Sequence, residues 1–290
     1  AYAALGGVEL VLDMLEDHEG GLWFALRNVG LIRLPPDWRN FSVLHEGRRE
    51  RGGLHSNRVF GASADAAGGL WLMHRDGVLE HVSRAGDVTG YLDKNDTRLP
   101  IRIGSAVLAR PDGRLWLGHA RGLSRFDPAS GHSDHWYADD SPDSPPRGVV
   151  DLLRHDTQGD LWLSAYGGGL QRRSADGRVL RTWRTDAADG LPAGSIEDLA
   201  FDPEGRPWLA GDFGVLRLQA DGERFLSVPG IEAGRLMGLA FSPEGDLWVA
   251  RPGFIERYAL HEERAELRDT IGRAQGLPTV EVGGMLVDAA

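Results

Sequence analysis

The chain has 290 residues, of which 41% are hydrophobic and 26% charged, a composition that predicts a soluble globular protein with a sizeable core. A net charge of −11 argues against a general nucleic-acid binder, and the lack of cysteine excludes disulfides, thiolate metal sites and cysteine nucleophiles. No stretch approaches the roughly 18 apolar residues that span a bilayer, so we expect no membrane contact by this segment.

A short motif that ends in tryptophan recurs six times. In chain order the copies are EDHEGGLW, DAAGGLW, RPDGRLW, DTQGDLW, DPEGRPW and SPEGDLW, which end at Trp23, Trp71, Trp116, Trp162, Trp208 and Trp248. The copies lie about 45 residues apart, a period typical of repeat architectures such as propellers. An apolar run precedes each tryptophan, from VLDMLED at 11–17 in the first copy to LMGLAFS at 236–242 in the last.

A glycine and a segment of alternating polarity follow each tryptophan. These segments are GLIRL at 30–34, GVLEHV at 77–82, GLSRFD at 122–127, GLQRRS at 169–174, GVLRLQ at 214–219 and GFIERY at 253–258. A final short strand such as FSVL, GYL, HWY, RTW or RFLSV closes the unit, which is therefore four strands joined by tight turns. ALHEERAELRDTIGRA at 259–274 is open between a helix and a long outer strand with its loop.

The repeat predicts an all-β fold, a β-propeller with four-stranded blades. Six blades are complete, and VGGMLVD at 282–288, which aligns with IEDLAFD at 196–202, is the first strand of a seventh. We expect a single domain over 1–290, with blades at approximately 8–50, 54–95, 101–139, 147–187, 193–229 and 233–272 and a partial blade at 278–290. This ending indicates a piece of a longer propeller or of tandem propellers. The alternative is a six-bladed ring with a spare strand.

The residue types of the motif explain its repetition. Aspartate and glycine reverse the chain between two strands, and tryptophan offers a large apolar surface to fill the wedge between neighbouring blades, so we assign the six tryptophans a structural role. DTQGDLWLSAYGGGLQRR at 156–173 also has partial likenesses to a calcium loop and a phosphate-binding turn. Both interpretations fail, because the other copies lose the oxygen ligands and the glycines at 167–169 lead into a strand, not a helix.

The repeat resembles the two-component regulator propeller family, found in hybrid histidine kinases and diguanylate cyclases. That family carries a D-x-x-G-x-L-W-x-G-T-x-x-G-G-L pattern and a G-L-P linker. The best copies here are DTQGDLWLSAYGGGL at 156–170 and RPDGRLWLGHARGL at 110–123, and the linker appears as DGLPAGSIEDL at 189–199. The resemblance implies a periplasmic sensory domain of a membrane-bound regulator, with no catalysis and no cofactor of its own. Most copies depart from the G-T after tryptophan, in the loops where a ligand would bind, so the ligand is not carried over.

Two sets of loops form the usual binding face of a propeller: those that enter the first strand and those between the second and third strands. By register the first set contains Arg58, Arg147 and Arg235, and the second contains Arg27, Arg75, His119, Arg121, Tyr166, Phe213 and Arg251. Because guanidinium groups suit carboxylates, sulfates and phosphates, these residues predict a small anionic ligand such as an anionic saccharide. The alternative is that arginine is simply abundant, since Lys94 is the only lysine, and that loops are exposed in any case.

Metal and acid–base chemistry have less support in the sequence. The ten histidines show no metal-ligand spacing, so we expect no metal site, and no nucleophile elbow or triad is present. Asp13, Asp151, Glu197 and Asp198 are expected to point toward the central channel, either as solvated carboxylates or as metal-binding or acid–base groups.

Two other functions stay open. One is a propeller lyase similar to virginiamycin B lyase, for which only His74, His119 and Glu197 could supply the required cluster. The other is a scaffold for protein interaction or dimerisation, including a homodimer formed through the full-length receptor.

Overall fold

A computed structural model of the chain describes residues 11–16, 18, 22–26, 30–34, 44, 46–47, 52–92, 103–139, 141–185, 191–261, 264–275 and 277. For 11–13, 22–26 and 30–34 it describes the backbone alone. The chain divides into two compact units, Ala1–Asn57 and Arg58–Ala290, and each is described by itself. The single domain expected over 1–290 stays a prediction.

The first unit contains a three-stranded antiparallel sheet of β1 (Val11–Glu16), β2 (Leu22–Leu26) and β3 (Gly30–Leu34). These are the first three strands expected of the first blade. Arg27 and most of the expected fourth strand, FSVL, lie outside the described residues, and so does the partial blade at 278–290.

The second unit contains five four-stranded antiparallel sheets, each made of four consecutive strands. The strands are β4 (Val59–Ala64), β5 (Leu70–His74), β6 (Leu79–Val82) and β7 (Val88–Leu92); β8 (Gly104–Ala109), β9 (Leu115–His119), β10 (Gly122–Phe126) and β11 (Ser133–Tyr137); β12 (Val150–His155), β13 (Leu161–Ala165), β14 (Gly169–Arg173) and β15 (Val179–Trp183); β16 (Ile196–Phe201), β17 (Pro207–Gly211), β18 (Gly214–Leu218) and β19 (Phe225–Ser227); and β20 (Gly238–Phe241), β21 (Leu247–Arg251), β22 (Phe254–Leu260) and β23 (Ala265–Ile271).

These sheets confirm the all-β prediction and the four-stranded repeat. In the segment 259–274 the strand alternative is the observed one, because β23 covers Ala265–Ile271 and only the short 3₁₀ turn η4 (Arg273–Gln275) is helical. Among the described residues no helix is long and apolar enough to cross a membrane.

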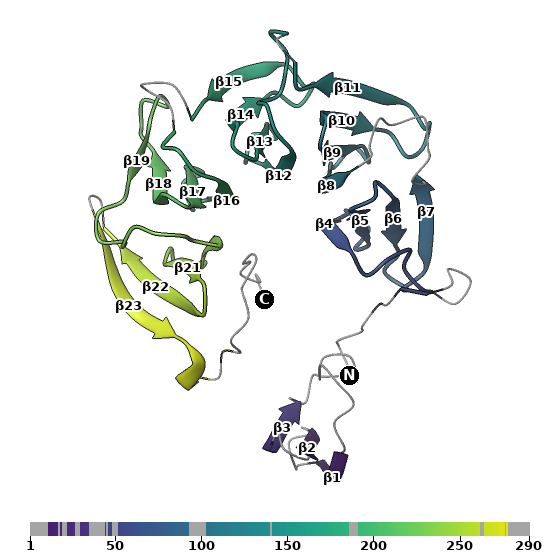
Figure 1. Cartoon of the computed structure of the whole chain (residues 1–290), viewed down its shortest axis with the longest axis vertical. Coiled ribbons are helices and arrows are strands. Elements are labelled where there is room, and N and C mark those ends of the chain that lie inside the picture. Colours follow the sequence, from purple (N-terminus) through teal and green to yellow (C-terminus); the bar gives the residue numbers. More distant parts are fainter. Residues whose placement is uncertain are drawn as a thin grey trace. The chain divides into compact units, whose positions relative to one another are not determined.

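Neighbouring sheets of the second unit pack through their first strands. β4 contacts β8, β8 contacts β12, β12 contacts β16 and β16 contacts β20. Figure 1 shows the first strands on the inner side of this succession and the fourth strands, such as β7, β11 and β15, on the outer side. Loops at one end of every sheet are thereby brought next to the loops of its neighbours.

Four of the motif tryptophans lie between a sheet and the next one along the chain. Trp71 shares a buried cluster with Leu115 and Leu117 of the following sheet, and Trp208 does so with Leu239 and Leu247. Trp116 and Trp162 hold the same position in their own sheets. Trp248 is half-buried, and the side chain of Trp23 lies outside the description.

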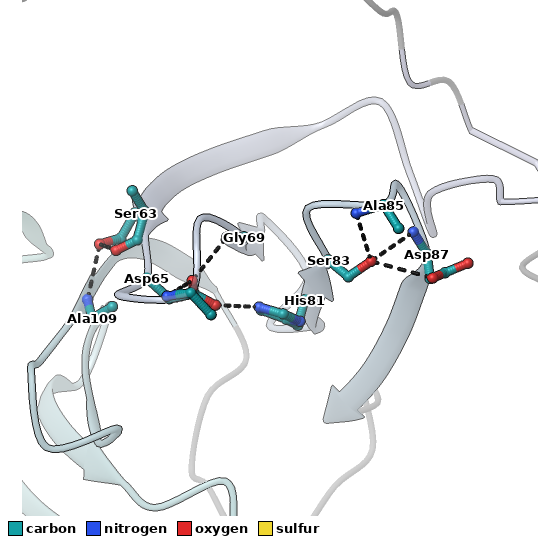
Figure 2. Close-up of polar contacts among 10 residues, drawn as sticks. Ser63, Asp65, Gly69, His81, Ser83, Ala85, Asp87 and Ala109 are labelled. Atoms are coloured by element: carbon teal, nitrogen blue, oxygen red, sulfur yellow. Dashed lines mark hydrogen bonds and ion pairs between the residues drawn. The ribbon is translucent and has the colours of Figure 1, made fainter.

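The aspartate of the motif does more than make a turn. Asp156 and Asp202 each accept a hydrogen bond from the indole N–H of the tryptophan six residues later, both at 2.9 Å. Figure 2 shows the equivalent Asp65, which accepts from the backbone N–H of Gly69 at 2.8 Å and pairs with His81 at 2.6 Å. Arg110 takes this place in RPDGRLW, and the Trp116 indole N–H has no hydrogen-bond partner among the described residues.

In the second unit a third-strand residue directly opposite each motif tryptophan lies against its ring. In four sheets this residue is arginine, with the guanidinium carbon 5.4–5.7 Å from the ring centroid in the pairs Arg125–Trp116, Arg172–Trp162, Arg217–Trp208 and Arg257–Trp248. The backbone register also sets Arg33 opposite Trp23 and His81 opposite Trp71. Part of the arginine content is therefore structural, since a planar cation packs on an indole face.

Candidate functional site

The second unit has a face that gathers the loops marked by the sequence for ligand binding. Arg75 N–H donates to the Arg58 carbonyl at 3.1 Å, and Tyr166 N–H donates to the Val149 carbonyl at 2.9 Å. Each of these bonds ties a second-to-third loop to the segment before a first strand. Neighbouring sheets are joined in the same way, because Gly104 N–H donates to the Arg75 carbonyl at 3.0 Å. We call this surface the loop face.

Two cavities open on the loop face at sheets β8–β11 and β12–β15. The larger, about 830 Å³, lies among the 139–148 loop, the 166–168 turn and the end of β15, and Arg147, Tyr166 and Arg184 are in its lining. The smaller, about 530 Å³, is lined by Ala120, Arg121, Tyr137, Ala138, Arg147 and Gly148. Because Arg147 and Gly148 line both, the two cavities are neighbours that share one loop.

Arginine and tyrosine give the cavities their chemistry. Tyr166 is 65% exposed, and the Arg121 guanidinium lies over the Tyr137 ring at 5.0 Å from its centroid. Among the described residues, neither Arg121 nor Arg184 has an ion-pair partner. Among the described residues that line the two cavities, Asp139 supplies the single carboxylate. An anion entering here would therefore meet cationic and aromatic groups with little opposing charge.

The 139–148 loop is held from beneath by a buried arginine of the next sheet. Arg173 on β14 donates to the Asp143 carbonyl at 2.5 Å, to the Gly177 carbonyl at 2.8 Å and to Gln171 Oε1 at 2.7 Å. Gln171 in turn donates to the Ser144 carbonyl at 3.0 Å. Burial lowers the pKa of Arg173 to about 10, so it stays cationic at neutral pH. The wall that carries Arg147 is thus fixed before any ligand arrives.

The structure brings three of the expected ligand residues together and leaves the others elsewhere. Arg121, Arg147 and Tyr166 line the cavities. Arg58, Arg75 and Arg235 are exposed outside both cavities, and Arg75 lies over the Phe60 ring at 5.2 Å. Phe213 is half-buried against the apolar cluster that contains Trp162.

His119 and Arg251 differ from the exposed loop residues that the register predicted. Each is the last residue of a second strand, is buried, and bonds to the middle of the third strand: His119 Nε2 lies 2.9 Å from Ser124 Oγ, and Arg251 Nε lies 2.6 Å from Glu256 Oε2. His74 makes the same contact with Glu80 at 2.8 Å. A polar residue in the middle of the alternating third segment was the sequence signal that could have placed these side chains inside the sheet.

Sequence reasoning missed Tyr137 and Arg184, which line the smaller and the larger cavity respectively. Both lie at or just after the end of a fourth strand, β11 and β15. The sequence marked only the end of each connection that enters a first strand, so the other end of the same connection, where it leaves the preceding fourth strand, escaped notice.

The expected channel carboxylates do not share one environment. Asp198 is buried and joins three sheets, because it accepts hydrogen bonds from Arg154 at 3.0 Å and from Leu239 N–H at 3.1 Å. Asp151 and Glu197 occupy the irregular position of β12 and β16, where the register shifts by one residue. The Asp13 side chain lies outside the described residues. Over the part of the chain that the structure describes, no three histidine, aspartate or glutamate side chains gather as a metal site.

Asp151 has an unusual pKa although its side chain is exposed. Surrounding protein desolvates the carboxyl and, helped by the nearby Glu197 charge, raises its pKa from 3.8 to about 6, against the opposing hydrogen bond from Ser164. Ser164 Oγ donates to Asp151 Oδ1 at 3.2 Å, so an asparagine could keep this acceptor.

We expect Asp151→Asn to change how stability depends on pH. Between about pH 4 and pH 6 the unfolded chain releases the Asp151 proton while the folded chain keeps it, so the parent loses stability as pH rises through this window. The Tm of the variant minus that of the parent should therefore increase from pH 4 to pH 6, measured by calorimetry. Glu197→Gln should narrow the window by lowering the pKa of Asp151, and a constant Tm difference across the window would contradict the assignment.

Comparison with known proteins supports the fold. No protein-family model matches the chain, and no curated protein matches it in sequence. Among solved structures it is similar to virginiamycin B lyase from Staphylococcus aureus with quinupristin, at a TM-score of 0.62 and 13% identity over 96% of this chain and 92% of that one.

Two extracellular domains from B. thetaiotaomicron are also similar. One, described as part of a one-component system, has a TM-score of 0.59 and 17% identity over 91% of this chain and 36% of that one. The other, described as part of a hybrid two-component system, has a TM-score of 0.55 and 14% identity over 94% and 48%. The chain thus spans less than half the length of either domain. At these identities the likeness shows a propeller fold and nothing finer.

Proposed function

We propose that this chain is a ligand-binding sensory propeller, part of the extracytoplasmic, periplasmic region of a membrane-bound signalling regulator. Its ligand is a small anionic molecule such as an anionic saccharide, bound in the two cavities that share Arg147. The likeness to extracellular domains of signalling proteins supports the sensory setting. The domain itself is not an enzyme in this proposal.

One observation carries the proposal. Arg121, Arg147 and Arg184 line two adjoining cavities in which Asp139 is the one carboxylate among the described lining residues, on a chain with a net charge of −11. Guanidinium forks bind carboxylate and sulfate oxygens in pairs, and a local field of one sign concentrates an anion.

The tyrosines extend the match to a saccharide. Tyr166 offers an exposed aromatic ring to the larger cavity, a surface on which the apolar face of a sugar ring can stack, and the Tyr137 ring in the smaller cavity carries the Arg121 guanidinium on one face. Because Arg147 lines both cavities, a ligand of more than one unit could contact both. The Arg173 hydrogen bonds keep the shared wall in place and reduce the entropy lost on binding.

Titration calorimetry with oligogalacturonates and sulfated disaccharides tests the proposal. We expect at least one of these anions to bind, uncharged oligosaccharides of equal length not to bind, and added salt to weaken the affinity. Arg121→Ala and Arg147→Ala should each weaken binding about tenfold, as expected for loss of a charge-assisted hydrogen bond.

Arg235→Ala is the matched control, because Arg235 is exposed on the same molecule but lines neither cavity. Its affinity for the anion should equal that of the parent. Failure of every anionic glycan to bind, or equal binding by the three variants, would refute the proposed site.

A further inference from the structure

We propose that His119, Ser124 and His135 form a directed hydrogen-bond relay that positions the Arg121 turn at the edge of the smaller cavity. The relay crosses sheet β8–β11 from its second strand to its fourth. It makes Ser124 and the two histidines positioning residues for the Arg121 subsite, and in this consequence it rests on the proposed function.

Four contacts in series define the relay. Arg121 N–H donates to His119 Nδ1 at 3.2 Å, and His119 Nε2 lies 2.9 Å from Ser124 Oγ. Ser124 Oγ lies 2.9 Å from His135 Nδ1, and His135 Nε2 lies 3.2 Å from Ser133 Oγ. The chain of contacts therefore runs from the backbone of the cavity loop to the outermost strand.

The first contact sets the direction of the others. A backbone N–H can only donate, so His119 Nδ1 must be the bare, accepting nitrogen and Nε2 must carry the proton. His119 Nε2–H then donates to Ser124 Oγ, which leaves the Ser124 hydroxyl proton to donate to His135 Nδ1. His135 completes the series as the same tautomer and donates from Nε2 to Ser133. Every donor in the series finds an acceptor only when both imidazoles are neutral and share this tautomer.

Burial supports this assignment. His119 is 1% exposed and Ser124 is fully buried, on the side of the sheet whose Leu117 and Phe126 pack against Trp71 and Met73 of the preceding sheet. Burial, with smaller contributions from His135 and Arg121, lowers the pKa of His119 to about 4. His119 is therefore neutral at neutral pH, as the relay requires.

The relay ends beside the ligand groups. Gly122 pairs in register with both His119 and Tyr137, so the turn at 120–121 is clamped between the second and fourth strands. Ala138 N–H also donates to the Arg121 carbonyl at 3.0 Å. Without the Ser124 hydroxyl, His119 Nε2–H would lose its acceptor and the imidazole ring would no longer be held in place. The hydrogen bond from the Arg121 backbone N–H to His119 Nδ1 would then weaken.

Nitrogen-15 NMR of the imidazoles and amide hydrogen exchange test the relay without any ligand. At pH 7 we expect His119 and His135 to carry the proton on Nε2, with Nδ1 bare. In Ser124→Ala the Arg121 amide should exchange about tenfold faster, which corresponds to the loss of roughly one hydrogen bond. Ser130→Ala, on the exposed turn of the same hairpin, should leave that rate unchanged.

A protonated His119 Nδ1 in the parent protein, or an unchanged Arg121 exchange rate in a folded Ser124→Ala variant, would overturn the relay. The tautomers of His119 and His135 in the parent protein test the relay even if the Ser124→Ala variant does not fold. Titration of Ser124→Ala with oligogalacturonate forms a separate arm, in which a fall in affinity of about threefold or more supports the positioning role and an unchanged affinity refutes it. If no anion binds the parent while the tautomers are as assigned, the proposed function fails and the relay stands.

Discussion

Replacement of Trp162 by alanine is expected to lower the free energy of unfolding by about 3–5 kcal/mol, the usual cost of deleting a large buried aromatic side chain. Trp162 is 2% exposed, stacks on Trp183 with ring centroids 5.2 Å apart, and meets Phe201 of the next sheet edge-on at 6.0 Å. Its indole N–H bonds to Asp156 at 2.9 Å, so the substitution also removes a donor from a mostly buried carboxylate.

Chemical denaturation of the parent and variant would measure this change. Trp248→Ala is the matched control: it deletes the same side chain from the same motif, but Trp248 is only half-buried and should cost clearly less. Equal losses for the two variants would show that burial between sheets is not what the tryptophan contributes.

Arg251→Ala should also be strongly destabilising, by about 3–5 kcal/mol, because it leaves the buried Glu256 carboxylate without its cationic partner. Arg251 Nε lies 2.6 Å from Glu256 Oε2, Arg251 Nη2 donates to the Glu232 carbonyl at 2.7 Å, and Tyr258 O–H donates to Glu256 at 2.9 Å. Burial, together with the Glu256 charge, raises the pKa of Tyr258 to about 12, so its proton stays available to Glu256. Thermal or chemical unfolding would detect the loss without any ligand.

A double variant separates the buried pair from a ligand-binding role. Arg251→Met with Glu256→Met removes both charges and should recover most of the lost stability, since apolar replacement of a buried ion pair is often neutral. If Arg251 instead acted as an exposed ligand residue, Arg251→Ala would change the unfolding free energy by less than about 1 kcal/mol. Strictly additive effects in the double variant would contradict the pairing.

The register explains why His119 and Arg251 were misplaced. In the sequence each of them lies three residues after the motif tryptophan and shortly before the glycine that opens the third segment, so it looks like part of the loop. Pairing shows that it is still strand, since His119 pairs with Gly122 and Arg251 with Phe254. A single position separates a loop residue from a strand residue that can reach its neighbour strand, and strand ends cannot be read from sequence to that accuracy.

The structure also divides the arginines, which the sequence treated as one group, into two kinds. The alternating third segments GLSRF, GLQRR, GVLRL and FIERY each place an arginine opposite a motif tryptophan. Those side chains cover indole rings, whereas Arg121, Arg147 and Arg184 face the cavities. Composition counts all of them alike, because the difference lies in whether a residue stands on a third strand or in a loop.

The strands, their order within each unit and the wedge position of the tryptophans could be predicted from the sequence alone, because each depends on contacts within one repeat or between adjacent repeats. Local turn chemistry and alternation of apolar residues repeat with the same period, so six copies reinforce one another. The candidate site could not be predicted in this way. Arg121, Arg147 and Tyr166 come from three different loops, and only the packing of β8 against β12 brings those loops to one place.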